Sequence, residues 1–304
     1  IIRVVIATGI SSVVTQLLTI REFLSQFQGN EIVIALIFFN WLILGGIGTL
    51  VARVFVTNTR KPTADILAWL SLVLSLLALL QLMAIRQLRD LVFVQGSSVG
   101  FYPTLLFSLL TIAPYCLLLG FVLPTSLFVL RTHTTGYPGA RIYIADNIGD
   151  VSGGVLFSFV LVFWVSPLTA LFLAHLPLLV SSFLLFTPAR RNHPAVLSAV
   201  LLAVLVLGGG IGFENMSLAP ARDKVVFHSE TRYGRIAVHQ DQEQFTLFEN
   251  GVPMFSNQNR SHAEESIHYP LSQLDTIQQV LLISAEGGVM RELKKYPVQS
   301  VDYV

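Results

Sequence analysis

The stretch TLLFSLLTIAPYCLLLGFVLPTSLFVL, residues Thr104–Leu130, decides the fold class of this chain because it contains no Asp, Glu, Lys or Arg. A helix that crosses a bilayer needs roughly 20 mostly apolar residues, because about 30 Å of hydrocarbon offers no water to the backbone groups. Comparable apolar runs occur at Ile32–Leu44, Ile66–Leu80 and Val196–Ile211. The sequence therefore predicts a polytopic α-helical membrane domain that contacts the lipid bilayer.

Charged residues become frequent only after residue 213. Residues 1–213 contain 17 Asp, Glu, Lys and Arg, whereas residues 214–304, less than half that length, contain 20. Charged side chains are costly at membrane depth and ordinary in water. We expect a transmembrane helical domain over residues 1–213 and a water-soluble domain over residues 214–304.

The composition excludes several classes of partner. Only 12% of the 304 residues are charged, against about 25% in an ordinary soluble domain. The net charge of +1 and the lack of a basic stripe argue against nucleic acid. The single cysteine, Cys116, excludes a disulfide or a thiolate metal cluster within the chain. The start at Ile1, without Met or a small-residue cleavage site, predicts a fragment whose first helix is retained.

About seven membrane helices are predicted. Proline disfavours helix in the residue before it, so Ser166-Pro167 separates the fifth helix from the sixth, and Pro124 is expected to kink the fourth. Glycines at Gly45-Gly46-x-Gly48 and Gly149-x-x-x-Gly153-Gly154 are expected to bring helices close together. The predicted spans are 3–20, 31–54, 64–85, 103–130, 144–165, 168–187 and 194–213.

Basic residues in the loops predict the orientation of this domain. One side of the membrane would hold Arg3, Arg53, Arg60, Lys61, Arg131, Arg141, Arg190 and Arg191. The other side would hold Arg21, Arg86, Arg89, Arg222 and Lys224. The side richer in Lys and Arg is normally cytoplasmic. We therefore expect an integral protein of the plasma or inner membrane, with the C-terminal domain outside.

The soluble part shows strand patterns followed by the start of a βαβ unit. Val225–Phe227 begins it, and two alternating segments, Arg235–His239 and Phe245–Phe248, suit an antiparallel hairpin. The expected elements that follow are a strand at Val252–Ser256, a helix near Ser261–Leu274, a buried strand at Val280–Ile283, a helix at Gly287–Tyr296 and a strand at Ser300–Val304. The chain ends inside that unit, so we expect a truncated Rossmann-like, methyltransferase-type sheet.

The soluble part resembles the spermidine synthase (polyamine aminopropyltransferase) family, especially members fused to a membrane region. The stretches that carry the resemblance are Glu230–Val238, Phe248–Ser256, Ala263–Leu271, Val280–Ile283, Met290–Pro297 and Val301–Val304. In the membrane region, Thr19–Glu22, Leu44–Gly46 and Asp146–Asp150 are similar to segments of those fused proteins.

The resemblance implies transfer of an aminopropyl group from decarboxylated S-adenosylmethionine to an amine such as the polyamine putrescine, without a metal. It implies that Glu264 is the catalytic, substrate-side carboxylate that receives a proton from the amine. It also implies that the loop after the first parallel strand binds the donor. That loop comprises Ser284, Ala285, Glu286, Gly287 and Gly288.

The chain departs from the family pattern at several of these positions. The family carries a Gly-Gly-Gly-Asp-Gly loop, whereas Ser284 and Ala285 bring side chains to the start of this one. The family's Tyr-His-Glu corresponds to His262-Ala263-Glu264, and its cofactor-contacting glutamine aligns with Met254. The later catalytic aspartate would lie past Val304. A catalytically inactive binding or scaffold domain is therefore an alternative function.

Acidic residues in two parts of the chain leave further alternatives open. Glu264 and His268 would share a helix face as a metal pair, although one pair lacks the third ligand of a zinc site. Asp146 and Asp150 suit either a helix cap or the cation path of a transporter with a sensor domain. Arg21-Glu22 is expected to close the first helix as an interfacial pair, and Cys116 and His175 to pack inside the bundle. Homo-oligomerisation is also left open.

Overall fold

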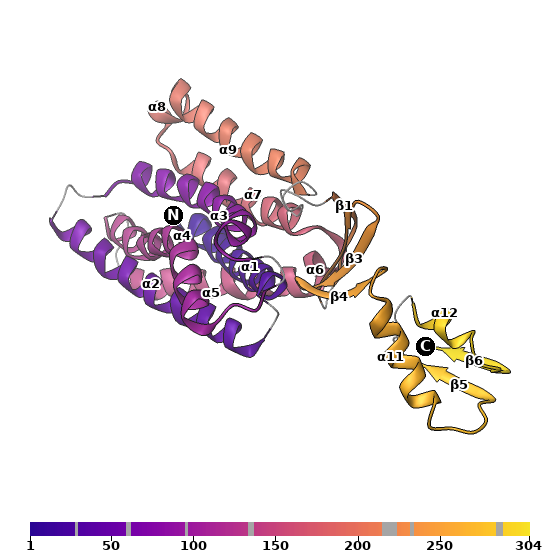
Figure 1. The fold of residues 1–304 in the computed structure, drawn as a ribbon. Coiled ribbons are helices and arrows are strands. Elements are labelled where there is room, and N and C mark those ends of the chain that lie inside the picture. The colour runs from indigo at the N-terminus through magenta and orange to yellow at the C-terminus, as the bar shows by residue number, and fades with distance from the viewer. Residues whose placement is uncertain are drawn as a thin grey trace. The chain divides into compact units, whose positions relative to one another are not determined.

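The computed structural model describes residues 1–27, 30–58, 62–94, 97–132, 137–214, 224–231, 234–283 and 288–304 (Figure 1). The chain divides into two compact units. The helical unit comprises Ile1–Leu218 together with Glu230–Gly234, and the second unit comprises Ala219–Ser229 together with Arg235–Val304.

Seven helices of the described chain are long and apolar enough to cross a membrane, as predicted, which indicates a membrane protein. The fifth consists of α5, a π-helical turn at Phe157–Leu161 and α6, and it is separated from α7 at Ser166-Pro167 as expected. A short helix, α8 (Pro188–Arg191), precedes the last one. The bounds are α1 (Ile2–Gln26), α2 (Glu31–Asn58), α3 (Ala64–Val92), α4 (Phe101–Arg131), α5 (Pro138–Leu156), α6 (Val162–Trp164), α7 (Pro167–Leu185) and α9 (Pro194–Gly212).

Three of the predicted helix bounds are wrong by more than a turn. The first and third helices were expected to end near residues 20 and 85, whereas α1 continues to Gln26 and α3 to Val92. Charged residues were taken as the exit from the apolar span, but Glu22 and Arg86 are both buried and pair with each other. Similarly, α5 begins at Pro138 and not near residue 144.

The outer surface of the helical unit is apolar over long helix faces. Leu42 and Leu50 of α2 expose 72% and 64% of their surface, and Leu201 of α9 exposes 59%. Soluble proteins rarely leave apolar patches of such extent exposed to water. These faces suit contact with lipid chains.

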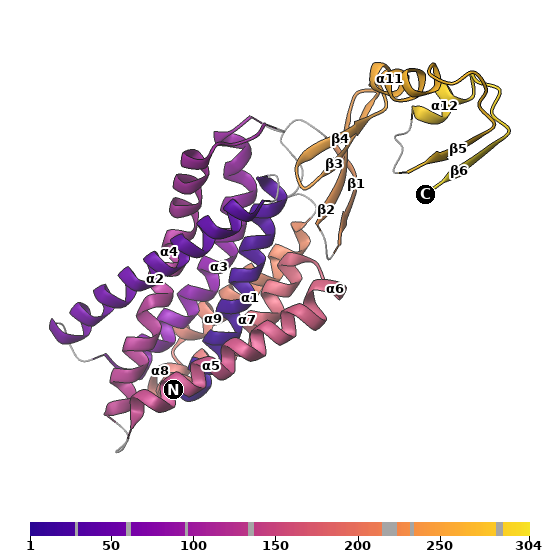
Figure 2. The same ribbon diagram turned by 90° about the horizontal axis from the view of Figure 1, so that it is seen from below.

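The two ends of the helical unit are identified by their contacts. At one end, Val5 of α1 packs with Leu130 of α4 and Ile142 of α5, and Asp65 of α3 accepts a hydrogen bond from the backbone of Thr187 (2.9 Å). The N-terminus and α8 lie at this end, which we call the arginine end (Figure 2). Its described charged residues are Arg3, Arg53, Asp65, Arg131, Arg141, Arg190 and Arg191.

Aromatic rings pack together at the opposite end, which we call the phenylalanine end. Phe27 of α1, Phe93 of α3 and Phe107 of α4 lie with ring centroids 5.4–5.9 Å apart. Arg21, Arg86 and Arg89 lie toward this end, at the C-terminal parts of α1 and α3. The predicted sorting is therefore confirmed for the described arginines of the helical unit.

Glycines allow two pairs of helices to touch through their backbones. A Cβ added at Gly48 of α2 would lie 2.2 Å from the carbonyl oxygen of Leu117, and one added at Gly149 of α5 would lie 2.4 Å from that of Ile6. Gly153 makes a similar approach to α1, so the predicted close packing is confirmed at these three positions. At Gly45 and Gly46 the prediction is wrong, because an added Cβ would meet no atom within 4 Å at either position.

The second unit begins with a four-stranded sheet in the order β1-β2-β3-β4. Strands β2 and β3 form the predicted antiparallel hairpin, with Ile236 opposite Glu249. Asn250 and Gly251 connect β3 to β4 with positive φ angles of 49° and 76°, as the tight turns of hairpins require. The strand bounds are β1 (Lys224–Glu230), β2 (Arg235–Asp241), β3 (Gln244–Glu249) and β4 (Val252–Ser256).

A helix and a parallel strand pair follow this sheet. They are α11 (Arg260–Leu271), β5 (Gln279–Leu282), α12 (Val289–Leu293) and β6 (Ser300–Tyr303). The predicted parallel pairing is confirmed, since Val280 lies opposite Val301. Ala263 and Ile267 of α11 bury against Leu282 and Leu293, so one apolar core holds the helices on the strands.

The glycines of α2 provide a matched test of helix packing. We expect Gly48→Ala to destabilise the protein by about 1–3 kcal/mol, because the methyl group would overlap the α4 backbone. Gly46→Ala, two residues away, is expected to be neutral or to stabilise by up to about 1 kcal/mol, the difference in helix propensity between the two residues. Thermal unfolding in detergent measures both, and equal midpoints would contradict the close α2–α4 contact.

Candidate functional site

The predicted donor-binding loop is only partly described. Ser284, Ala285, Glu286 and Gly287 lie outside the described residues, so their predicted role stays a prediction. Gly288 immediately precedes α12, and a Cβ added to it would lie 2.8 Å from the Cβ of Ala263. A side chain at position 288 would therefore push α12 away from α11.

Glu264 projects from the exposed side of α11. Its neighbour Ala263 is buried together with Ile267 and Leu271, which fixes the face that α11 turns to the core. Glu264 lies outside that buried face and is exposed. Its carboxylate is therefore open to a cationic ligand in solution.

A charged cluster around Glu292 was not foreseen from the sequence. Glu292 is 1% exposed, and its carboxylate accepts hydrogen bonds from Lys295 and from Arg291 Nε (3.3 Å). The ring nitrogens of His268 contact Glu292 (3.2 Å) and the hydroxyl of Tyr296 (2.8 Å). The hydrogen bond from Lys295 is the main cause that holds the pKa of Glu292 below its usual value. The cluster ties α11 to α12, the helix that follows the predicted donor loop.

The contacts of His268 concern the metal pair that the sequence suggested for Glu264 and His268. His268 directs both ring nitrogens to Tyr296 and Glu292, whereas Glu264 is exposed. Over the described residues, no group of three His, Cys, Asp or Glu side chains is placed to hold a metal ion. The i, i+3 spacing of Glu292 and Lys295 was visible in the sequence, but the contact of His268 with Glu292 joins residues 24 positions apart.

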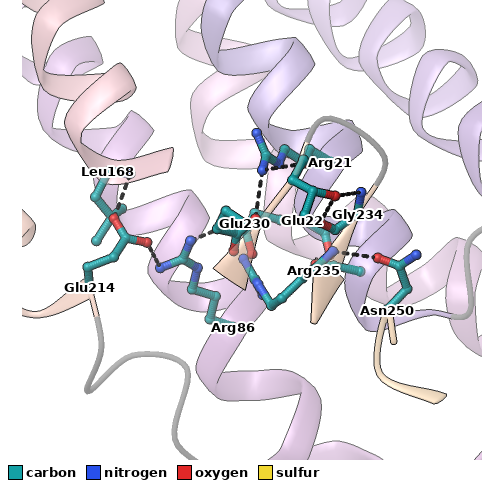
Figure 3. Close-up of polar contacts among 11 residues, drawn as sticks. Arg21, Glu22, Arg86, Leu168, Glu214, Glu230, Gly234, Arg235 and Asn250 are labelled. Carbon is teal, nitrogen blue, oxygen red and sulfur yellow. Dashed lines mark hydrogen bonds and ion pairs between the residues drawn. The ribbon is translucent and has the colours of Figure 1, made fainter. Parts of the chain in front are cut away.

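Within the helical unit, buried charges meet near the C-terminal parts of α1 and α3 (Figure 3). Arg86 donates to Glu22 of α1 at 2.5 Å and to Glu214, just after α9, at 2.8 Å. The other carboxylate oxygen of Glu214 accepts the backbone N–H of Leu168, in the first turn of α7. One guanidinium thus joins α3 to α1 and, through Glu214, to the start of α7.

Arg21 makes a second contact at this end of the helical unit. Its guanidinium lies 2.7 Å from the carboxylate of Glu230 and donates to the carbonyl of Thr231 at 3.1 Å. The hydroxyl of Thr231 in turn donates to the carbonyl of Gly234 at 2.9 Å. The expectation that Arg21 and Glu22 form an interfacial pair is wrong, since each has a distant partner and α1 continues past both.

Asp146 and Asp150 lie inside α5, two to three turns after its first residue, Pro138. The interpretation as a helix cap is therefore wrong. Both are half-buried where α5 crosses Gly9 of α1. A cation path through the two aspartates stays a prediction.

Elsewhere in the bundle, Cys116 and His175 are fully buried, as predicted for packing residues.

Comparison with known proteins identifies two distant relatives. Residues of this chain are 27% identical over 169 residues to a polyamine aminopropyltransferase of Oceanobacillus iheyensis, covering 52% of this chain and 33% of the relative. They are 28% identical over 184 residues to a polyamine aminopropyltransferase of Corynebacterium efficiens, covering 56% and 35%. No family profile and no solved structure matches the chain.

The extent of these matches is informative. The chain spans about a third of the length of the curated relatives it matches. The matched part exceeds half of the chain, whereas the residues after α9 form less than a third of it. The similarity therefore includes part of the helical unit. It supports the family that the motifs indicated, as a distant relationship.

The buried Arg86 cluster predicts a large effect of one substitution. We expect Arg86→Met to destabilise the protein by about 3–5 kcal/mol, because it removes the guanidinium that binds two carboxylates away from water. Both variants are unfolded in the same lipid-free detergent. Arg131→Met, at an exposed position, is the control and should change the free energy of unfolding by less than about 0.5 kcal/mol. Similar unfolding midpoints for the two variants would rule out a structural role of this cluster.

Proposed function

We propose that the protein is an integral membrane protein whose second unit is the N-terminal part of an aminopropyltransferase-type domain. The proposed reaction moves the aminopropyl group of decarboxylated S-adenosylmethionine to a polyamine acceptor. The observation that carries the proposal is the similarity to two polyamine aminopropyltransferases over more than half of the chain. The hairpin, α11 and the parallel pair β5–β6 occur in the order that the family motifs predict.

In this proposal Glu264 receives the amine. An ammonium group must lose a proton before its nitrogen attacks the carbon next to the donor's sulfonium, and a carboxylate within hydrogen-bond reach receives that proton. As the new C–N bond forms, the C–S bond breaks and the sulfur leaves as a neutral thioether. The buried face of α11 leaves Glu264 exposed for this role. The donor would lie against the loop that ends at Gly288, where α12 packs close to α11.

A binding or scaffold domain without turnover is the second candidate, and two observations favour it. Ser284 and Ala285 place side chains where the family has bare glycine backbone. In addition, the arginine end is the basic end of the helical unit, so by the positive-inside rule it faces the cytoplasm. Because α9 ends at the opposite end, the residues that follow it would begin outside, away from a cytosolic donor.

A transfer assay separates these two candidates. With decarboxylated S-adenosylmethionine and putrescine, we expect the full-length protein in proteoliposomes to form a longer polyamine. Glu264→Gln should lower kcat/KM by about 10²–10⁴-fold because it removes the proton acceptor. Glu265→Gln changes the adjacent exposed carboxylate and should leave the rate unchanged. Amine binding without product, measured by calorimetry, would refute transfer and leave the binding function.

Membrane orientation is tested with single cysteines at the two ends of the helical unit. Cys116 is buried, so the parent protein should not react with an impermeant maleimide. We expect Tyr102→Cys, at the start of α4, to react in intact cells, and Tyr137→Cys, before α5, to react only after permeabilisation. Both tyrosines are well exposed, at 78% and 87%. The reverse pattern would place the residues after α9 in the cytoplasm, where a donor is available.

A further inference from the structure

The two ends of the helical unit differ in charge as well as in packing. Among the described residues, the arginine end carries six arginines and one acid, Asp65, which lies 3.5 Å from Arg190. Toward the phenylalanine end, three arginines face five acids. Those arginines are Arg21, Arg86 and Arg89, and the acids are Glu22, Glu31, Asp90, Glu214 and Glu230. One end is therefore strongly cationic, whereas acids outnumber arginines at the other.

The arginines of the two ends also differ in burial. Arg86 and Arg89 expose 0% and 4% of their side chains and bond to carboxylates of the chain itself. At the arginine end, Arg3, Arg131 and Arg141 are exposed. Their guanidinium groups are open to a ligand outside the chain.

The surroundings of these arginines define the ligand. They stand at the ends of apolar spans, and Arg141 lies between two exposed tyrosines, Tyr137 and Tyr143. Tyrosine is enriched at the level of lipid headgroups, and arginine stems extend along apolar surface so that the guanidinium reaches the same level. A guanidinium binds phosphate through two parallel hydrogen bonds, and weak hydration favours such pairing.

We propose that the arginine end is a binding surface for anionic phospholipid headgroups, with Arg3, Arg131 and Arg141 as its principal contacts. The ligand is a phosphodiester held at the depth of the helix ends, with acyl chains along the apolar faces of the neighbouring helices. The carboxylates of Asp146 and Asp150 do not lie beside the bound phosphodiester, because they are on α5 at least one turn further into the span than Arg141. This function is independent of any transfer reaction.

The test compares lipids on the purified full-length protein in a neutral detergent. Dioleoylphosphatidylglycerol should raise the unfolding temperature, because a ligand that binds only the folded protein stabilises it by mass action. Dioleoylphosphatidylcholine, which has the same chains and no net charge, should have little effect. An equal shift by both lipids would overturn the proposal, as would an equal shift by inorganic phosphate, which would show a site for a free anion.

Variants assign the effect to the named residues. The triple variant Arg3→Gln, Arg131→Gln, Arg141→Gln should weaken phosphatidylglycerol binding by about 100-fold, since each basic residue near an anionic surface contributes about a fivefold factor. Glu31→Gln, exposed on α2 away from the arginine end, is the control and should bind as the parent does.

Native mass spectrometry counts bound lipid directly, so the result does not depend on a change in thermal stability. Because all three positions are exposed, the triple variant should fold. The triple Arg→Lys variant, which keeps the positive charge, is a second control. It should retain at least a tenth of the parent affinity for phosphatidylglycerol. Unchanged lipid binding by the Gln variant would refute the assignment to these three arginines.

Discussion

The buried guanidinium of Arg86 is the interaction on which the end of the helical unit depends. Moving a charge out of water costs several kcal/mol, so Arg86 can occupy its position only with carboxylates beside it. It binds Glu22 from α1 and Glu214 from the chain just after α9, and Glu214 also accepts the N–H of Leu168. A single cation therefore fixes α1 and α3, the start of α7 and the point where the chain leaves the last helix (Figure 3).

Apolar length allowed the seven helices to be predicted, because a span needs no partner to be recognised in the sequence. The same reasoning misplaced the helix ends. The sequence suggested that the helices leave the membrane at Glu22 and Arg86. Both are instead buried in a cluster that also includes Glu214, 128 residues after Arg86 in the chain. The start of α5 was missed for a related reason, since Asp146 and Asp150 resemble a cap until their close approach to Gly9 is known. Local patterns do not contain such contacts.

In the second unit, the order of elements could be predicted because hairpin turns and buried strands have local signatures, such as Asn250-Gly251. The exposed position of Glu264 follows from the spacing of Ala263, Ile267 and Leu271 on α11. The contact between His268 and Glu292 could not be predicted, because it joins two helices through a strand pair. Glu292 lies on α12, the helix that follows the predicted donor loop.

The distribution of charge links the lipid surface to the choice between the two candidate functions. If the arginine end binds an anionic cytoplasmic leaflet, the chain leaves α9 on the other side, because α9 ends where Glu214 meets Arg86. A carboxylate such as Glu264 binds an amine equally well on either side of a membrane. Transfer also requires the aminopropyl donor, which is made from a cytosolic metabolite. In the proposed function, the side of the membrane would therefore decide between transfer and amine binding alone, and the positive-inside rule ties that side to six arginines far from Glu264 in the sequence.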